Sequence, residues 1–414
     1  MPRLVMKFGG TSVADLDRIR NAARKVKREV ERGYDVAVVV SAMSGKTNEL
    51  VAWVRDAASP PGTNETGLYD AREYDAVVSS GEQVTSGLMA LVLQQMGISA
   101  RSWQGWQVPV HTSDAHGAAR ILDIDTRGLD QKYAEGHQVA VIAGFQGIAP
   151  DGRIATLGRG GSDTTAVAFA AALKAERCDI YTDVDGVYTT DPRIERRARK
   201  LDRISYEEML ELASLGAKVL QTRSVEMAMN HKVRLQVLSS FEDLPGTLVC
   251  DEEEILEQSV VSGVAYSRDE AKVTLLKVPD RPGVAASIFG PLAEAGINVD
   301  MIVQNIGADG MTDMTFSLST DQIGAAREAL SAASEAIGYQ SLVVDDEVAK
   351  VSIVGIGMRS HAGVAQTMFS ALAADGVNIK VITTSEIKVS VLIDRRYMEL
   401  AVQSLHKAFD LDAD

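Results

Sequence analysis

Two glycine-rich segments of the sequence have residue types that could bind phosphate groups. The first, Lys7-Phe8-Gly9-Gly10-Thr11-Ser12, follows a short apolar stretch and leads toward a helical pattern. Glycines allow backbone N–H groups to approach a phosphate closely, and the lysine supplies a positive charge. A double glycine after a strand can also form only a tight turn, so this segment alone leaves both interpretations open.

The second segment, Gly158-Arg159-Gly160-Gly161-Ser162-Asp163, is the stronger indication of a binding loop. It joins a flexible backbone to a guanidinium that can bind an anion through two nitrogens. Ser162 or Asp163 can cap the alanine-rich helix that follows. Such a loop could hold an anionic substrate while its acidic side chain meets an ammonium group or organises Mg²⁺.

A third segment, from Thr182 to Arg193, places three carboxylates near the end of a predicted strand. It does not match a calcium-binding EF-hand loop, because Gly186 falls at the fourth loop position and the EF-hand needs glycine at the sixth. We interpret it as a nucleotide-binding turn. The alternative is that Asp and Gly simply fill a long turn.

Other polar residues near element ends give weaker indications. Ser44-Gly45-Lys46-Thr47 looks like the end of a P-loop, but that pattern requires glycine where this chain has Val40. Ser41 and Thr47 could still hold a polar ligand at the carboxyl edge of a sheet. Glu82 stands just ahead of a predicted helix and could meet a substrate ammonium, although an acid in a first helical turn is also ordinary.

Strand and helix patterns alternate through the first half of the chain and would position these segments. The stretch 4–8 reads as a buried strand, and apolar residues at helical spacing from Leu16 to Val30 predict a helix that stops at Gly33. Further predicted elements are strands at 36–40, 138–143 and 179–183, a helix with Val84, Leu88, Leu91 and Val92, a helix at 164–175, and a helix opened by the capping box Ser205–Glu208. This alternation predicts a largely parallel sheet covered on both faces, within about residues 1–245.

After the acidic run at 251–254, which we interpret as a solvated linker or an exposed helix start, the sequence repeats itself. Residues that recur 80 positions later include Gly283, Ala285, Phe289, Leu292, Gly296 and Asn298, matched by Gly363, Ala365, Phe369, Leu372, Gly376 and Asn378. Predicted strands at 273–278 and 351–356 precede the two helices. Two unrelated amphipathic helices would rarely match in register, so we expect a duplicated module rich in βαβ units.

Composition narrows the class of protein. A length of 414 residues suggests two or three domains, and a net charge of −15 argues against nucleic acid as the main partner. Two cysteines without a C-x-x-C pair suit a reducing compartment, and the six histidines form no metal-binding pattern. With no apolar signal core at the start and no apolar run long enough to cross a bilayer, we expect a cytoplasmic protein without a membrane partner.

The segments 7–12, 79–82, 157–163 and 182–188, taken together, resemble the motifs of the aspartokinases, which belong to the amino acid kinase family. The duplicated C-terminal module resembles a tandem ACT domain, a regulatory unit of many aspartokinases. The resemblance implies an α/β protein: a three-layer αβα amino acid kinase fold with a mainly parallel sheet, followed by two ferredoxin-like βαββαβ ACT modules. The implied boundaries are a catalytic domain at 1–245, a linker at 246–264, and ACT modules at 265–344 and 345–414.

The resemblance also implies a reaction. ATP would phosphorylate the β-carboxylate of L-aspartate to 4-phospho-L-aspartate, the first step of lysine, threonine and methionine biosynthesis, with Mg²⁺ entering as a cofactor bound to ATP. A carboxylate is already ionised at pH 7 and needs no general base, so the chemistry requires charge neutralisation by Lys, Arg, Mg²⁺ and N–H groups. Two other functions stay open: an amino acid kinase acting on acetylglutamate, glutamate or a nucleoside monophosphate, and a non-catalytic amino-acid sensor.

Roles for individual residues follow from the same resemblance. The implied catalytic residues are Lys7, Arg159 and Asp163. The implied ATP contacts are Lys7, Phe8, Gly9, Gly10, Ser12, Thr182, Asp183, Tyr188, Arg193 and Lys218. The implied aspartate contacts are Ser41, Thr47, Glu82, Arg159, Gly160, Gly161, Ser162 and Asp163, and no protein ligand for a metal is expected.

The ACT resemblance implies feedback inhibition by lysine, threonine or both, and a homo-oligomer formed through the ACT modules. Acidic and amide side chains suit the ammonium and carboxylate of an amino acid. The implied effector residues are Asp280, Gly283, Ala285, Asn298 and Asp300 in the first module, and Asn378, Ile379 and Ser385 in the second. The alternative is that the duplication serves dimerisation alone.

Overall fold

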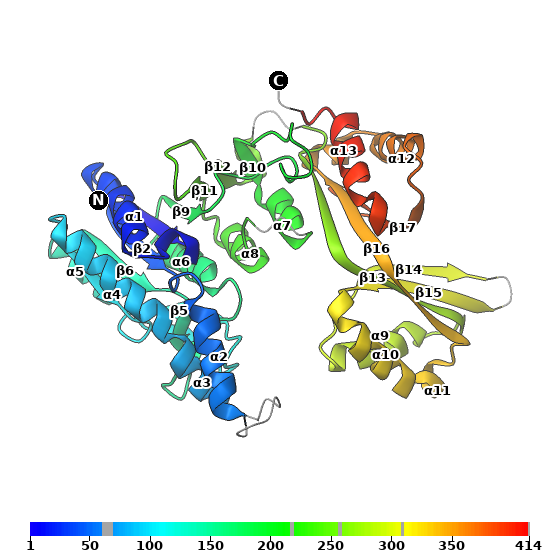
Figure 1. Cartoon of the computed structure of the whole chain (residues 1–414), viewed down its shortest axis with the longest axis horizontal. Coiled ribbons are helices and arrows are strands. Elements are labelled where there is room, and N and C mark those ends of the chain that lie inside the picture. The colour runs from blue at the N-terminus through cyan, green and yellow to red at the C-terminus, as the bar shows by residue number, and fades with distance from the viewer. Residues whose placement is uncertain (60–68, 216–218, 256–258, 308–309, 413–414) are drawn as a thin grey trace. The chain divides into compact units, whose positions relative to one another are not determined.

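The computed structural model describes residues 1–59, 69–215, 219–255, 259–307 and 310–412, which form two compact units (Figure 1). The first unit contains the described residues of 1–187, 200–213 and 219–255. The second contains 188–199, 214–215 and the described residues from 259 onward. The second half of the predicted nucleotide-binding turn, 188–193, therefore belongs to the C-terminal unit.

The first unit is built around an eight-stranded, mainly parallel sheet. In spatial order its strands are β10 (Arg203–Ser205), β12 (Thr247–Cys250), β11 (Leu235–Ser239), β9 (Arg177–Thr182), β1 (Arg3–Phe8), β2 (Asp35–Val40), β6 (Val139–Ala143) and β3 (Ala100–Trp103). β11 and β12 pair antiparallel, and the other neighbouring pairs are parallel. Val36 to Val40 are buried along β2, as expected of a strand covered on both faces.

Helices form a layer on each face of this sheet. α1 (Leu16–Glu31) and α4 (Ser80–Gln95) pack together on one face, and α6 (Gly161–Ala172) and α8 (Thr222–His231) pack together on the other. The remaining helices of the unit are α2 (Lys46–Ala58), α3 (Ala71–Val78), α5 (Arg127–Ala134) and α7 (Tyr206–Ser214), with 3-10 helices η1 (Gly10–Val13) and η2 (Glu252–Glu254). The predicted three-layer αβα arrangement is confirmed.

The predicted start of α7 is confirmed in detail. The Ser205 hydroxyl accepts a hydrogen bond from the Glu208 backbone N–H at 3.2 Å, and the Glu208 carboxylate accepts one from the Ser205 N–H at 3.2 Å. These two bonds satisfy N–H groups that a helix start otherwise leaves open.

The prediction of which residues form the apolar face of α4 is partly wrong. Val84 and Leu91 are 57% and 62% exposed, whereas Met89, Ala90 and Leu93 are buried. The cause is that the start of this helix buries polar residues, Glu82 among them, at the sheet edge. The stretch Ala71–Gln95 is long and apolar enough to cross a membrane by length and composition, yet half of its most apolar window is buried inside the protein.

A smaller four-stranded sheet also belongs to the first unit and was not predicted. Its strands, in spatial order, are β5 (Ile121–Ile124), β4 (Val110–Thr112), β7 (Gln146–Ile148) and β8 (Ile154–Thr156). β8 leads directly into the Gly158–Asp163 segment, so this sheet sets where that segment begins.

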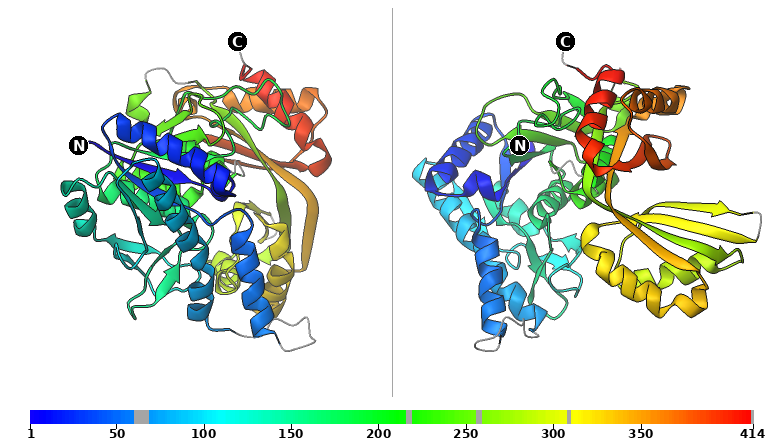
Figure 2. Two further views of the ribbon diagram at one scale, coloured as in Figure 1. Left: turned by 60° about the vertical axis from the view of Figure 1, so that its left-hand side comes forward. Right: turned by 45° about the vertical axis from the view of Figure 1, so that its right-hand side comes forward.

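The second unit is one antiparallel six-stranded sheet with two sets of helices. Its strands, in spatial order, are β14 (Asp300–Ile306), β15 (Met311–Leu318), β13 (Gly263–Pro279), β16 (Ser341–Val354), β18 (Lys388–Asp394) and β17 (Ile379–Thr384). Its helices are α9 (Val284–Glu294), α10 (Ile323–Ala332), α11 (Ser334–Ile337), α12 (Val364–Ala374) and α13 (Met398–Ala408), with η3 (Thr320–Gln322), η4 (Ile356–Ser360) and η5 (Arg395–Tyr397). Figure 2 shows the long strands β13 and β16 running from one helix set to the other.

The backbone of the second unit explains the repeat. Gly283 and Gly363 have φ of 90° and 93° at the starts of α9 and α12, and Gly296 and Gly376 have φ of 70° and 69° after those helices. These left-handed conformations favour glycine, so both copies keep it at the same places. Each copy buries its own apolar cluster.

Three boundaries expected from the sequence can be compared with the helices and strands of the observed fold. The expected junction at 344/345 lies inside β16, and the range 246–264 includes β12, a strand of the first unit. The strand expected at 351–356 ends at Val354, and Ile356 begins η4.

Candidate active site

The two glycine-rich segments meet through a buried ion pair. Lys7 lies near the end of β1, and Asp163 lies in the first turn of α6. The Lys7 Nζ and Asp163 Oδ1 atoms are 2.5 Å apart, and the two residues are only 8% and 9% exposed. The residues around 7–12 and those around 157–163 therefore line the same edge of the parallel sheet.

Close backbone approaches bring the ends of neighbouring strands to this edge. A Cβ atom on Gly10, after β1, would come within 3.0 Å of the Ala42 carbonyl oxygen, which follows β2. A Cβ atom on Gly144, after β6, would lie 2.9 Å from the Ser162 hydroxyl. The carboxyl ends of β1, β2 and β6 thus converge on the start of α6, where open α/β sheets bind their ligands.

Two of the expected ATP contacts have buried side chains. The Phe8 ring is fully buried and stacks on Tyr181 with ring centroids 4.7 Å apart. The Ser12 hydroxyl is buried and shares a hydrogen bond with the hydroxyl of Ser240. These side chains hold the loop in place, and the glycine backbone between them is the part suited to a phosphate.

Glu82 is buried beside the chain that follows β2. Its Oε1 accepts a hydrogen bond from the Ala42 N–H at 3.0 Å, and its Oε2 is buried without a hydrogen-bond partner among the described residues. Burial raises the pKa of Glu82 to about 7, against the opposing effect of the backbone hydrogen bond from Ala42. Ser41 and Thr47, the other expected contacts here, are half-buried next to this position.

The backbone conformation of the turn that carries Arg159 favours glycine on both sides of that residue. Gly158 and Gly160 both adopt left-handed conformations, with φ of 74° and 75°. A Cβ atom on Gly160 would lie 2.4 Å from Gln221, and one on Gly161 would lie 2.7 Å from Phe145. Arg159 itself is exposed, and its side chain has no hydrogen bond or ion pair within the described part of the chain.

The residues expected on the nucleoside side are divided between the two units. Thr182 ends β9, and its hydroxyl donates to the Asp183 carboxylate at 3.2 Å in the first unit. Tyr188 and Arg193 belong to the second unit. There the exposed Arg193 guanidinium pairs with Asp191 and helps to lower the pKa of that carboxyl to about 2. Lys218 lies outside the described residues.

The expected effector residues lie on the second unit. The Asp300 carboxylate, at the start of β14, lies 2.8 Å from Lys350 Nζ, which also pairs with Glu270 at 2.8 Å. Next to Asp300, Met301 packs in a buried cluster with Val381 of β17. Asp280, Gly283, Ala285, Asn298, Asn378 and Ser385 are exposed and Ile379 is half-buried. β14 and β17 stand at opposite edges in the strand order but pack against each other, so Asp300 and Ile379, expected in separate modules, lie on strands that are in contact.

Several residues around the site gave no signal in the sequence. Ala42 acts through its backbone N–H, Ser240 through a hydroxyl on a distant segment, and Gln221 by filling the space beside Gly160. Asp75 of α3 and His116, in the loop between β4 and β5, form a buried pair. None of these lies within a glycine-rich or charged run, so spacing alone could not indicate them.

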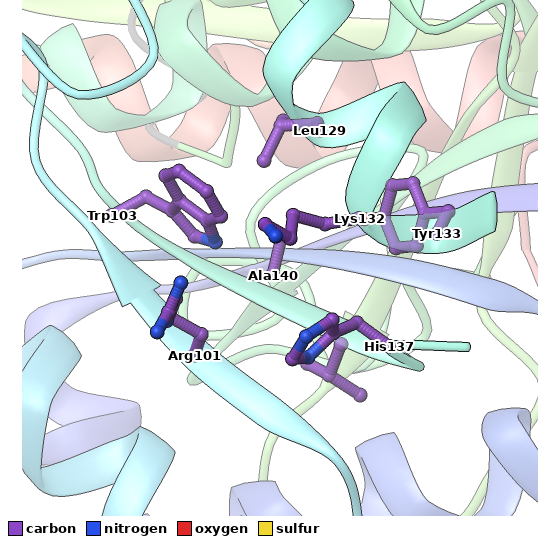
Figure 3. Close-up of a pocket in the computed structure, with 8 residues that line it drawn as sticks. Arg101, Trp103, Leu129, Lys132, Tyr133, His137 and Ala140 are labelled. Atoms are coloured by element: carbon purple, nitrogen blue, oxygen red, sulfur yellow. The ribbon is translucent and has the colours of Figure 1, made fainter. Parts of the chain in front are cut away.

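A small pocket elsewhere in the first unit contains none of the expected site residues (Figure 3). It lies between β3, β6 and α5, and is lined by Arg101, Trp103, Leu129, Lys132, Tyr133, His137, Val139 and Ala140. Within the described ranges, no group of three or more His, Cys, Asp or Glu side chains is placed to hold a metal ion.

Comparison with known proteins identifies the family. Residues 2–239 match the amino acid kinase family, and residues 272–335 and 351–409 each match an ACT domain. The chain is 53% identical over 414 residues to the aspartate kinase of Pseudomonas putida, covering 100% of this chain and 98% of that protein. The chain belongs to the aspartokinases. The other kinases and the non-catalytic sensor considered from the sequence are set aside by this full-length match.

Solved aspartokinase structures share the architecture. The structure of Escherichia coli aspartokinase III in complex with aspartate and ADP has a TM-score of 0.80 and 28% identity, covering 98% of this chain and 99% of that one. A second structure of that aspartokinase, in complex with lysine and aspartate, has a TM-score of 0.78 at 28% identity, with the same coverage. The predicted α/β class, with a mainly parallel kinase sheet followed by ACT modules, is confirmed.

Proposed function

We propose that this aspartokinase transfers the γ-phosphate of ATP to the β-carboxylate of L-aspartate, giving ADP and 4-phospho-L-aspartate. The observation that carries the proposal is the Lys7–Asp163 pair, which joins the two anion-binding segments at one sheet edge. The Escherichia coli relative that binds aspartate and ADP supports the same substrates. The catalytic domain would comprise residues 1–245, followed by a linker at 246–264 and ACT modules at 265–344 and 345–414.

The reaction needs little covalent chemistry from the protein. An oxygen of the ionised aspartate carboxylate attacks the γ-phosphorus, and the bond from that phosphorus to the bridging oxygen breaks to release ADP. No proton has to be removed from the nucleophile. The protein must instead hold two anions together and stabilise the charge on the transferring phosphoryl group.

The residues at the sheet edge suit these tasks. Lys7 would contact the transferring phosphate, with Asp163 holding the ammonium of that lysine in place. Arg159 would bind a substrate carboxylate, and Glu82 would bind the substrate ammonium from its buried position beside Ala42. Ser41, Thr47, Gly160, Gly161 and Ser162 would complete the aspartate site. Phe8, Gly9, Gly10, Ser12, Thr182, Asp183, Tyr188, Arg193 and Lys218 would form the ATP side.

Mg²⁺ bound with ATP would neutralise charge on the phosphate oxygens. Asp163 is already paired with Lys7. The carboxylates near the sheet edge would therefore assist in binding the metal without enclosing it.

An ADP-release assay across acceptors tests the function. With Mg²⁺ and ATP, we expect turnover with L-aspartate and at most about one hundredth of that turnover with acetylglutamate, because a site built for the substrate ammonium rejects an acetylated one. Glutamate keeps the ammonium but is one methylene longer, and its turnover should be at least about tenfold lower than that of aspartate. Equal turnover with either alternative, or none with aspartate, would contradict the proposal.

For regulation, we propose inhibition by lysine, threonine or both through the ACT modules of a cytoplasmic homo-oligomer. The lysine-bound Escherichia coli relative supports lysine as an effector. Titration of activity with lysine and threonine, singly and mixed, distinguishes independent from concerted inhibition. Light scattering with and without effector gives the oligomeric state.

A further inference from the structure

A buried Asp–His pair lies beneath the turn that carries Arg159. Asp75 of α3 is fully buried, and its Oδ2 atom lies 2.7 Å from His116 Nδ1. The same carboxylate accepts hydrogen bonds from the Gly117 N–H at 3.1 Å and from the Thr156 hydroxyl of β8. One side chain thus joins a helix, the loop between β4 and β5, and the strand that leads into the Arg159 turn.

The hydrogen bond to Asp75 orients the His116 ring through one nitrogen, Nδ1. The His116 side chain is 6% exposed, and its Nε2 atom is buried without a hydrogen-bond partner among the described residues. The imidazole ring of His116 therefore makes its hydrogen bond to Asp75, through Nδ1.

The loop held by Asp75 supports the Arg159 turn directly. A Cβ atom on Gly158 would lie 3.3 Å from the Gly117 carbonyl oxygen, so these backbones are in contact. The Ala119 N–H donates to the Thr156 carbonyl at 2.9 Å. Arg223 then binds the Leu157 and Ala119 carbonyls, each at 2.9 Å, and ties the strand end to the loop.

The position of Arg159 follows the backbone of the turn that carries it. Its side chain is exposed and makes no hydrogen bond or ion pair to the described residues, so its direction is set by the backbone of the turn. An error of about 1 Å in the position of a substrate-binding group can reduce the rate about a hundredfold.

We propose that Asp75 and His116 are positioning residues for aspartate binding, acting through the 117–119 loop and the Gly158 backbone on Arg159. The inference rests on the proposed function, in which Arg159 binds a substrate carboxylate. It assigns a role in substrate affinity to a buried hydrogen-bonded pair that touches neither substrate. Changes to the pair should alter the KM for aspartate and leave the KM for ATP unchanged, because the pair contacts the Arg159 turn and not the loop after β1.

The test compares the KM for aspartate and the KM for ATP in full-length variants. His116→Leu removes the donor to Asp75 and should raise the KM for aspartate about tenfold, with the KM for ATP within about twofold. His116→Asn keeps an N–H donor near the Nδ1 position and should restore most of the loss. His111→Leu, at an exposed position in the same hairpin, is the matched control and should leave both constants within about twofold.

A mutant cycle separates positioning from general structural damage. If His116 acts through Arg159, His116→Leu should change the KM for aspartate by less than about twofold once Arg159→Ala is present. Thr156→Val, which deletes another donor to Asp75 with little change in volume, should give a smaller rise of the same kind, and it serves if His116→Leu does not fold.

The outcomes distinguish the two proposals. Absence of wild-type turnover with aspartate would overturn the function itself. An active wild type whose His116→Leu or Thr156→Val variant keeps its KM for aspartate, or raises both KM values in parallel, would overturn the positioning role. Equal effects of His116→Leu with and without Arg159 would do the same.

Discussion

The Lys7 ammonium and the Asp163 carboxylate form a buried ion pair, 2.5 Å between Nζ and Oδ1, that connects the end of β1 to the first turn of α6. A buried charge is costly unless a partner holds it, so the pair fixes the lysine where an incoming phosphate would arrive. The same carboxylate prevents the lysine from folding back toward solvent.

Replacing Lys7 should remove catalysis more than folding. Lys7→Ala should lower kcat by a factor of about 10² or more, because a charge that stabilises the transferring phosphoryl group is lost. It also leaves Asp163 buried without its cation, which should cost on the order of 2 kcal/mol of unfolding free energy. Steady-state ADP release and urea denaturation measure the two effects. Lys46→Ala is the matched control, since Lys46 is partly exposed and pairs with Glu49, and its turnover should stay within about twofold. Near-normal turnover in Lys7→Ala would remove the proposed role.

Aspartate affinity should depend on pH through Glu82. Its pKa is raised to about 7 by burial, so below that pH the free enzyme holds a neutral acid that attracts an ammonium weakly. The KM for aspartate should therefore fall about tenfold between about pH 6 and pH 8. Glu82→Gln should raise this KM and abolish its pH dependence. A wild-type KM that is flat over this range, or a Glu82→Gln variant that keeps the slope, would exclude the ammonium contact.

The same shift has a consequence for stability. The folded pKa of Glu82 lies above its ordinary value of 4.5, so the native protein binds the proton more tightly than the unfolded chain does. This contribution is fully present below about pH 4.5 and is lost as the pH rises through about 7, a change on the order of 3 kcal/mol. Urea denaturation at about pH 5 and pH 8 should show wild type losing stability relative to Glu82→Gln. An unchanged difference between the two proteins would contradict the raised pKa.

The sequence was most informative where one element dictates its own residues. The β-branched run of β2 predicts a buried strand, and the apolar spacing of α1 predicts a helix. The glycines of the repeat mark left-handed backbone conformations that occur at both α9 and α12. The small sheet could not be predicted, because strands of three or four residues such as β8 carry no readable alternation. Asp75 and His116 could not be predicted for a different reason. Their partners come from separate segments of the chain, and each residue looks ordinary within its own segment.

The turn after β8 should tolerate no side chain at Gly160. Gly160→Ala combines a left-handed φ of 75° with a Cβ atom 2.4 Å from Gln221, so the turn must shift and Arg159 with it. We expect the KM for aspartate to rise at least about tenfold. Gly97→Ala is the control, because Gly97 has a φ of 81° but open space around it. It should cost about 1 kcal/mol of unfolding free energy without changing the kinetics. Equal kinetic effects of the two substitutions would show that backbone strain alone, not the position of Arg159, is responsible.

Lysine sensitivity should depend on the carboxylate of Asp300. Although burial opposes it, the hydrogen bond from Lys350 lowers the pKa of Asp300 and keeps it ionised, while about half of its side chain stays exposed to an incoming ammonium. Asp300→Asn removes the charge with little change in volume, and Lys350 keeps its bond to Glu270. The lysine concentration for half-inhibition should rise about tenfold or more, the cost of one charged hydrogen bond. Asp345→Asn is the matched control, because Asp345 also pairs with a lysine, Lys380, at 2.7 Å between two strands of the same sheet. If both variants shift the inhibition curve equally, the charge of the sheet as a whole is responsible, and Asp300 does not contact the effector.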